Sequence, residues 1–326
     1  MANVLVTTSC PHGCSCCFAS ELARTAGAAS ISEAAFGRCL DWIEESGGHE
    51  VRLVGGEPTA HPALPELMAM ALDRGLGVTI LTGGLIEPRL ADAVAETPES
   101  RVSVVFNLNA AAGRDGLARL EENLDRLAPR GALACTIDRL PFPSDGLEQL
   151  ARRPTLRQPV TIRLGLAHPG PSGRNAWIRP SRYASVARRV RELALRLDDV
   201  GARVELDCGF VRCAFDDEAV SVLERTHAVL RFQCRPIIDL TPDGRVLHCL
   251  ALGDRWSCAM AGPMPEIRRR MLADRAGFDE VGVFPDCREC GWKAEGVCDG
   301  GCMSVRLRRF RVAPVSTVSW VGRRME

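Results

Sequence analysis

The feature that most constrains the fold is a regular alternation of short apolar segments with amphipathic segments over the first two thirds of the 326-residue chain. The short segments are typical of buried β-strands and lie at residues 3–7, 51–53, 78–81, 101–107, 161–166 and 203–206, with a shorter one near 132–137. The amphipathic segments have a helical period and lie at about 33–45, 63–74, 88–95, 114–126, 146–152 and 181–199. Ser32 is a suitable N-cap for the first helix, and Gly75 and Gly77 mark the exit of the second. Repeated βα units predict a parallel sheet or barrel, with its chemistry at the C-terminal ends of the strands.

The character of the chain changes after about residue 210, where the alternation stops and cysteine and glycine become dense. We therefore expect two domains, an α/β domain at residues 1–210 and a small cysteine-rich domain at residues 211–326.

The overall charge is balanced, with 41 basic and 41 acidic residues, so the composition does not favour nucleic acid or a membrane as an obligatory partner. The longest apolar candidate for a membrane span, residues 64–86, is interrupted by Glu66, Asp73 and Arg74. The N-terminus lacks the features of a signal peptide, which predicts a cytoplasmic protein. In a reducing compartment the 15 cysteines are more typical of metal ligands than of disulfides. Cys39 and Cys135 lie far from the others, in a predicted helix and strand, and are expected to be buried apolar residues.

Three cysteines follow the first predicted strand in a CX3CX2C motif, namely Cys10, Cys14 and Cys17. Three thiolates on a short loop can hold three corners of a [4Fe–4S] cluster and leave the fourth iron open to another ligand. A second motif, Gly55, Gly56, Glu57 and Pro58, ends the second strand. Its glycines would let the backbone approach a ligand, and its carboxylate suits an ammonium group, whereas the alternative is a plain strand-to-helix turn.

Together these two motifs resemble the radical S-adenosylmethionine (SAM) superfamily. The resemblance implies a partial (β/α)6 TIM-like barrel, a [4Fe–4S] cluster on Cys10, Cys14 and Cys17, and SAM bound at the open iron with its amino group near the residues from Gly55 to Pro58. Asn107 and Asn109 end the fourth strand, where such enzymes often place polar residues toward SAM; a polar strand-end turn is the alternative. Cys16 occupies a position that is usually aromatic and is an alternative ligand, although the spacing favours Cys17.

The cysteine-rich end resembles the SPASM extension of these enzymes. Residues 239–248 are predicted to form a hairpin with a Pro-Asp-Gly turn that brings Cys234 and Cys249 side by side. The resemblance implies one or two auxiliary [4Fe–4S] clusters, the first on Cys234, Cys249 and Cys302 with Cys213 or Cys208 completing it, and the second on Cys287, Cys290 and Cys298. The last cysteine of the SPASM pattern is absent, so the second site needs a substitute such as Cys258, a different ligand or an open position, or only one cluster forms as in twitch-type relatives. Structural zinc is the competing interpretation.

The resemblance implies reductive cleavage of SAM to a 5′-deoxyadenosyl radical, which removes hydrogen from a substrate. Ribosomal peptides or proteins are the expected substrates; the alternatives are a dehydrogenase or epimerase of a small natural-product intermediate, and a non-catalytic iron–sulfur or zinc scaffold. The implied partners are SAM and an electron donor such as flavodoxin or ferredoxin. No peptide-recognition domain precedes the first strand, which weakens the peptide interpretation without excluding it, because a separate peptide-recognition protein can supply that domain. His168 and Asp207, at strand ends, are candidates for a catalytic acid or base, with strand-end hydrogen bonding as the alternative. The arginine-rich segments 268–270 and 306–311 are candidates for docking an acidic leader peptide, or are solvated helix faces.

Overall fold

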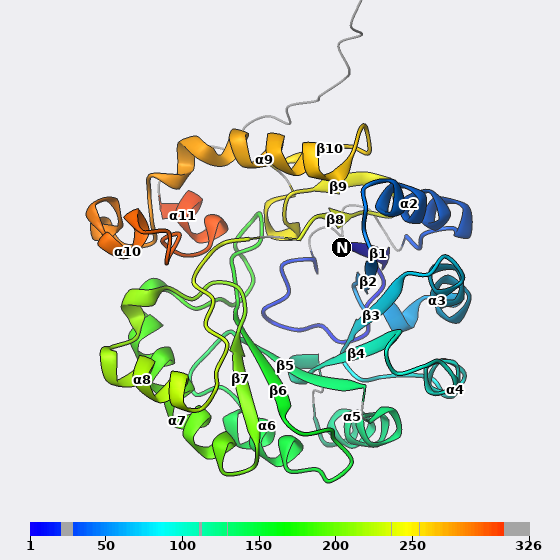
Figure 1. Cartoon of the computed structure of the whole chain (residues 1–326), viewed down its shortest axis with the longest axis horizontal. Coiled ribbons are helices and arrows are strands. Elements are labelled where there is room, and N and C mark those ends of the chain that lie inside the picture. Colours follow the sequence, from blue (N-terminus) through cyan, green and yellow to red (C-terminus); the bar gives the residue numbers. More distant parts are fainter. Residues whose placement is uncertain (21–28, 111–112, 129, 236, 254, 310–326) are drawn as a thin grey trace, which may run out of the picture.

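The computed structural model describes the whole chain except residues 21–28, 111–112, 129, 236, 254 and 310–326. Seven parallel strands follow one another in chain order: β1 (Ala2–Thr7), β2 (Glu50–Gly55), β3 (Gly77–Thr82), β4 (Val102–Asn107), β5 (Gly131–Ile137), β6 (Val160–Leu166) and β7 (Ala202–Leu206). Each strand pairs with the next, and in Figure 1 they curve into an open ring with helices around the outside. The α/β class and the partial TIM-like barrel are confirmed.

The outer helices begin and end close to the predicted residues. They are α2 (Glu33–Glu45), α3 (Leu64–Asp73), α4 (Pro88–Glu96), α5 (Gly113–Leu127), α6 (Ser144–Ala151), α7 (Tyr183–Asp198) and α8 (Asp217–Arg225). Ser32 caps α2 as expected, because its side chain accepts a hydrogen bond from the backbone N–H of Ala35. Gly75 has a φ of +81°, the left-handed conformation that ends α3.

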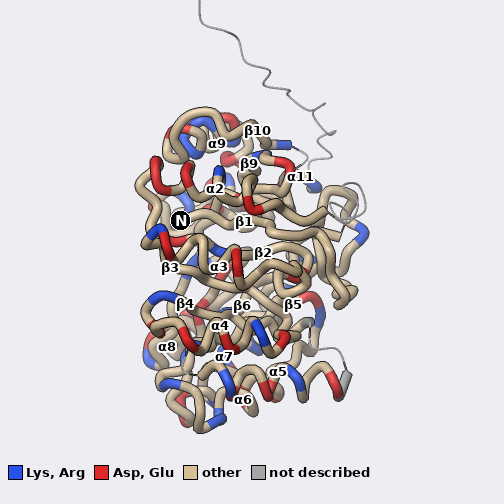
Figure 2. The backbone as a smooth tube through the Cα atoms, turned by 90° about the vertical axis from the view of Figure 1, so that its right-hand side faces the viewer, with Lys and Arg blue, Asp and Glu red and all other residues tan. Residues whose placement is uncertain are grey.

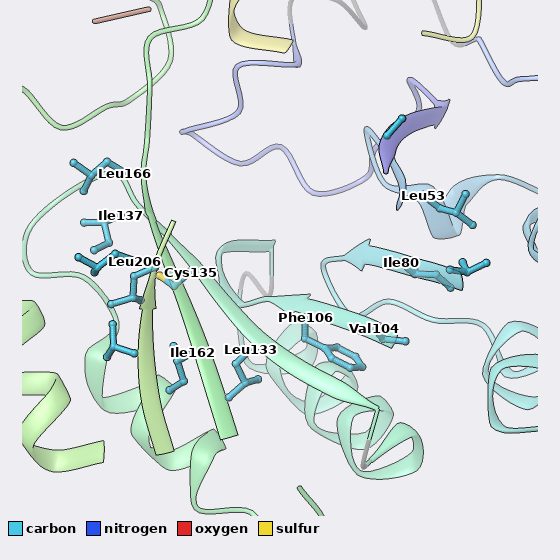
Figure 3. Close-up of a cluster of buried hydrophobic side chains, with 14 of the residues drawn as sticks. Leu53, Ile80, Val104, Phe106, Leu133, Cys135, Ile137, Ile162, Leu166 and Leu206 are labelled. Carbon is cyan, nitrogen blue, oxygen red and sulfur yellow. The ribbon is translucent and has the colours of Figure 1, made fainter. Parts of the chain in front are cut away.

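The core lies between the strands and these helices. Figure 3 shows its strand side, where alternate residues such as Phe106, Leu133 and Ile162 point to one face of the sheet. Cys135 is part of this layer, and Cys39 is buried in the same core, so their predicted role as apolar core residues is confirmed. The intervening residues of β6 are less buried and include the charged Arg163. The strands therefore keep polar side chains for their other face.

The cysteine-rich end extends the same sheet. The predicted hairpin forms from β8 (Asp239–Leu240) and β9 (Arg245–Leu247), joined by β10 (Ser257–Ala259). Strand β8 pairs in parallel with β1, so the hairpin lies beside the first barrel strand. The helices α9 (Met264–Asp279), α10 (Gly291–Ala294) and α11 (Met303–Arg309) follow, at the side of the ring opposite α5 and α6 in Figure 1.

Two details differ from the sequence-based expectation. The strand near 132–137, expected to be shorter, is seven residues long and matches β6 in length. The helical layer continues past residue 210, because α8 packs against α7. The division at residue 210 stays a prediction.

No helix in the described ranges is long and apolar enough to cross a membrane. Figure 2 shows that acidic and basic residues alternate along the backbone of the visible helices, without a long stretch of one sign.

Candidate iron–sulfur and SAM site

The loop that follows β1, at residues 8–20, carries the first cysteine motif and is called the cluster loop below. It runs across the open centre of the ring in Figure 1. Cys10 is exposed, and Cys14 and Cys17 are half-buried. The backbone N–H of Cys17 donates to the carbonyl of Cys14 at 3.1 Å, which folds the loop into a turn. Burial, followed by the charges of the neighbouring Cys10 and Cys17 thiols, raises the pKa of Cys14 to about 11. The structure thus brings the three predicted cluster ligands together.

Cys16 is in a different environment from these three residues. It is buried, and burial followed by the charge of Asp138 raises its pKa to about 12. The charge of the Cys16 thiol also contributes to the raised pKa of Cys135 in strand β5. Cys16 therefore faces the end of β5, where its side chain fills space against the barrel wall.

The Gly55–Gly56 pair lets the end of β2 touch the start of the cluster loop. The backbone N–H of Gly56 donates to the carbonyl of Thr7, and that of Glu57 donates to the carbonyl of Ser9, both at 2.8 Å. A Cβ on Gly55 would lie 2.4 Å from the Thr7 oxygen, and one on Gly56 would lie 2.4 Å from the Ser9 oxygen. We expected these glycines to let the backbone approach a ligand. In the structure they let it approach the backbone of Thr7 and Ser9, at the end of β1 and the start of the cluster loop.

The Glu57 carboxylate is buried and ties three segments together. One oxygen accepts from His12 Nε2 at 3.0 Å and from the backbone N–H of Gly83 at 2.7 Å. The other accepts from the N–H and hydroxyl of Thr59 at 3.1 and 2.9 Å, and from the Thr82 hydroxyl at 2.8 Å. Burial acts to raise the pKa of Glu57, but these hydrogen bonds outweigh it and lower the pKa. Pro58 opens a short 3₁₀ turn, Pro58–Ala60, immediately after it.

Asn107 and Asn109 use their amides within the protein. The Asn107 side chain accepts from the backbone N–H of Asn109 at 3.1 Å. Asn109 both accepts from and donates to the backbone of Thr136, at 2.6 and 2.7 Å, and its own carbonyl accepts from the Cys14 thiol at 3.7 Å. These bonds match the strand-end turn that was the alternative to SAM contact, and they place Asn109 beside the cluster loop.

The loop after β6 covers the other side of the cluster loop. Asn175 donates to the carbonyls of Cys16 and His168 at 3.0 and 2.7 Å, and accepts from the N–H of Gly170 at 2.8 Å. The N–H of Ala176 donates to the carbonyl of Ser15 at 2.8 Å. Sequence patterns did not single out Asn175, because its partners lie on two loops that are distant in the chain.

The two candidate acid–base residues have partners of different kinds. Asp207 accepts from Arg163 at 2.9 Å and is half-exposed. His168 is buried, and its ring lies within hydrogen-bond range of the Cys302 thiol, which raises the pKa of His168 against the opposing effect of burial. A catalytic role for either residue stays a prediction, and the contact with Cys302 ties His168 to the cysteine-rich end.

The C-terminal cysteines form two groups, and within each group the charge of one thiol shifts the pKa of another. The first group consists of Cys208, Cys234, Cys249 and Cys302. The second group consists of Cys213, Cys287, Cys290 and Cys298. Cys258 belongs to neither, because only burial and the charge of Arg270 act on its thiol. In the described part of the chain no three His, Cys, Asp or Glu side chains converge closely enough to hold a single metal ion.

Two arginine side chains of the predicted peptide-docking segments have internal roles. Arg306 is fully buried and donates to the carbonyls of Gly301 and Asp299, so this arginine is neither solvated nor free to dock a leader peptide. Arg308 donates to the carbonyls of Gly170 and Pro171. Residues 310 and 311 of the predicted segment lie outside the described residues.

The donor chemistry fits iron–sulfur clusters. All three groups consist of thiols, which are the usual ligands of such clusters. Thiol sulfurs also receive hydrogen bonds, from the backbone N–H of Gly300 to Cys298 at 3.3 Å and from Arg275 to Cys234 at 3.7 Å. N–H donors to sulfur stabilise a thiolate and are a means by which proteins set the potential of a cluster.

Residues 4–140 match the radical SAM superfamily. A curated relative, the GTP 3′,8-cyclase of Chlorobaculum tepidum, is 25% identical over 146 residues, which cover 42% of this chain and 44% of that protein. The match thus spans less than half of this relative.

Solved structures share the fold over nearly the whole chain. SuiB of Streptococcus suis bound to its precursor peptide SuiA has a TM-score of 0.66 at 14% identity, covering 96% of this chain and 73% of SuiB. The same protein bound to SAM has a TM-score of 0.65, at 14% identity and with 94% and 73% covered. Native anSMEcpe with bound AdoMet and the Cp18Cys peptide has a TM-score of 0.62 at 14% identity, covering 93% of this chain and 89% of that one. The part of the chain that carries the three cysteines and the turn from Gly55 to Pro58 is thus the part that matches the radical SAM superfamily.

Proposed function

We propose that this radical SAM enzyme cleaves SAM reductively at a cluster held by Cys10, Cys14 and Cys17, and then removes a hydrogen atom from a peptide substrate. The observation that carries the proposal is the position of three grouped thiols on a loop across the barrel centre. A [4Fe–4S] cluster bound there would supply the electron that splits SAM into methionine and a 5′-deoxyadenosyl radical, given an electron donor such as flavodoxin or ferredoxin.

The protein's own contribution is to hold that loop in place. Glu57 anchors it from the β2 side through His12, Asn109 anchors Cys14 from the β4 side, and Asn175 anchors Cys16 from the β6 side. Fixing the loop on three sides favours one geometry between the reacting groups, and a protein contributes to the chemistry of a reactive cofactor mainly by such positioning.

A cavity beside this loop is a candidate for the substrate. It has a volume of about 370 Å³ and lies between the loop after β6 (Gly173, Trp177, Arg179, Pro180) and the C-terminal part (Val283, Val305, Arg308). The guanidinium of Arg179 lies 5.0 Å from the ring centroid of Trp177. The same loop touches the cluster loop, because a Cβ on Gly170 would lie 3.3 Å from Phe18. An aromatic face with two arginines suits an extended chain that carries carbonyl or carboxylate groups.

A peptide is favoured over a small molecule by this cavity and by two solved structures of similar fold that hold peptides. A separate recognition protein would bring the peptide to the enzyme. The SPASM-like assignment of residues 211–326 is part of the same proposal.

The test is transfer of deuterium. A candidate precursor peptide labelled with deuterium at carbon is incubated with the anaerobically reconstituted enzyme, SAM and a reductant, and 5′-deoxyadenosine is analysed by mass spectrometry. We expect deuterium in 5′-deoxyadenosine, and a peptide that has lost this deuterium together with one further hydrogen, or that has exchanged deuterium for hydrogen. A Trp177→Ala variant should raise the KM for the peptide while leaving SAM cleavage without peptide unchanged. Transfer from a small molecule but from no peptide would contradict the peptide assignment.

A further inference from the structure

We propose that Cys213 is the fourth protein ligand of the second auxiliary cluster, so that both C-terminal clusters are closed by four cysteines. This inference rests on the proposed function for the presence of iron–sulfur clusters. It takes the fourth ligand of that cluster from the barrel side of the molecule.

The segment that carries Cys213 is fixed against the second group of cysteines. Cys213 lies in a short 3₁₀ turn, Arg212–Ala214, that follows β7. The guanidinium of Arg212 lies 4.6 Å from the ring centroid of Trp292. The carbonyl of Trp292 accepts from the backbone N–H of Cys298 at 3.0 Å, so the ring stacked on Arg212 belongs to the turn that presents this thiol.

Two further contacts hold the same segment. Gly301 has a φ of +89°, and a Cβ on it would lie 3.0 Å from a methyl group of Val211 and 2.8 Å from one of Val283. On the other side of Cys213, Phe215 packs against Phe232 with 5.7 Å between ring centroids. The carbonyl of Phe232 accepts from the N–H of Asp299 at 3.1 Å. The turn is therefore fastened to the glycine-rich knuckle on both sides of its cysteine.

The thiols of the second group lie close enough to act on one another. Cys287, Cys298 and Cys290 are the three thiols whose charges act on Cys213. Gly300 approaches the same place, because a Cβ on it would lie 3.7 Å from the Cys287 sulfur.

The first group is complete without Cys213. Cys302, Cys234 and Cys249 are the three thiols that act electrostatically on Cys208. The Cys302 sulfur lies 3.1 Å from the Ser304 hydroxyl. Because Cys208 and Cys213 are separated by a turn and face different groups, each group receives one cysteine from the end of β7. Cys258, considered earlier as a substitute, lies on β10 apart from both.

Closed ligand sets limit what these clusters can do. A metal centre whose positions are all filled by protein ligands has a structural or electron-transfer role, whereas direct binding of substrate needs an open position. We therefore infer that the substrate does not ligate either auxiliary cluster, and that the one open iron belongs to the N-terminal motif.

The test compares Cys213→Ala, Cys287→Ala and the double variant with a matched control, Cys258→Ala, in the full chain reconstituted anaerobically. Iron and sulfide are counted, and EPR spectra are recorded with and without SAM. Wild type is expected to hold about 12 iron atoms, for three [4Fe–4S] clusters. Cys213→Ala should either drop to about 8 iron atoms or keep the count with an altered auxiliary EPR signal. The double variant should lose no more than Cys287→Ala alone, because both residues would serve one cluster. Cys258→Ala should match wild type.

The proposal is overturned if Cys213→Ala has the iron content and EPR spectrum of wild type, if the losses in the double variant add, or if wild type binds zinc at the second group. A Cys213→Ser variant and circular dichroism guard against a simple folding defect. The N-terminal cluster provides an internal reference, because SAM should change its EPR signal in wild type and in Cys213→Ala alike. Absence of that change in wild type contradicts the proposed function, whereas an unaltered auxiliary signal in Cys213→Ala contradicts only the ligand assignment.

Discussion

The Glu57 carboxylate is the most connected polar group at the cluster loop, and Glu57→Gln tests its role. The substitution keeps the shape and replaces one oxygen with an N–H₂ group, which cannot accept a hydrogen bond. If the N–H₂ lies opposite His12, the imidazole can adapt by presenting an acceptor nitrogen, but the backbone N–H of Gly83, now 2.7 Å from Glu57, loses its acceptor. One buried donor without a partner costs about 1–3 kcal/mol. If the N–H₂ group points the other way, the backbone N–H of Thr59 loses its acceptor instead.

The assay is urea unfolding of the cluster-free protein, with Glu45→Gln on the exposed side of α2 as the control. We expect the free energy of unfolding to fall by about 1–3 kcal/mol for Glu57→Gln and by less than about 0.5 kcal/mol for the control. Because the pKa of Glu57 is lowered in the folded state, its contribution is present above the unfolded pKa of about 4.3 and is lost as the pH falls through the folded pKa. The difference between wild type and Glu57→Gln should shrink below that pH. Equal stabilities at pH 7 would refute the anchoring role.

Two other substitutions test the packing of the cluster loop and of the hairpin. The Cβ of Gly56→Ala would lie 2.4 Å from the Ser9 carbonyl, so this variant should be destabilised by about 1–3 kcal/mol and should retain less iron at the N-terminal motif. Gly277→Ala on α9 is the control, because no atom lies within 4 Å of its Cβ, and it should be neutral or stabilising in thermal melts. Burial raises the pKa of Asp239 to about 6, against the hydrogen bond from Asn3. Ionisation therefore opposes folding, and the free energy of unfolding should fall by about 2 kcal/mol between pH 4 and pH 7. Asp239→Asn should remove that slope in urea titrations at several pH values, and a slope that persists would contradict the assignment.

The barrel could be predicted because its strands and helices have strong local patterns. β6 alternates buried and half-buried residues along its whole length, and α2 begins at a capping serine. The pairing of β8 with β1 could not be predicted, because β8 has two residues and its partner lies more than 230 positions earlier. Such a short strand gives no pattern, and only the folded sheet selects its neighbour.

The site shows the same division between local and distant information. The spacing of Cys10, Cys14 and Cys17 predicts the cluster loop, because these three cysteines lie within eight consecutive residues. The sequence suggested an ammonium group as the partner of Glu57, which stays a prediction. Its protein partners His12, Thr82 and Gly83 could not be predicted, because they lie on other segments of the chain. Cys208 and Cys213 could not be assigned to separate groups for a similar reason. They are five positions apart, and only the turn between them determines which group each thiol joins.

The central claim is tested most directly by measuring 5′-deoxyadenosine formed from SAM by the reconstituted, reduced protein, in wild type, Cys14→Ala and Cys16→Ala. The structure separates the half-buried Cys14 from the buried Cys16, which faces β5. We expect wild type and Cys16→Ala to form 5′-deoxyadenosine, and Cys14→Ala to form none above the reductant-only background. Formation by Cys14→Ala at the wild-type rate, or none by a wild-type sample with a full iron content, would contradict the account.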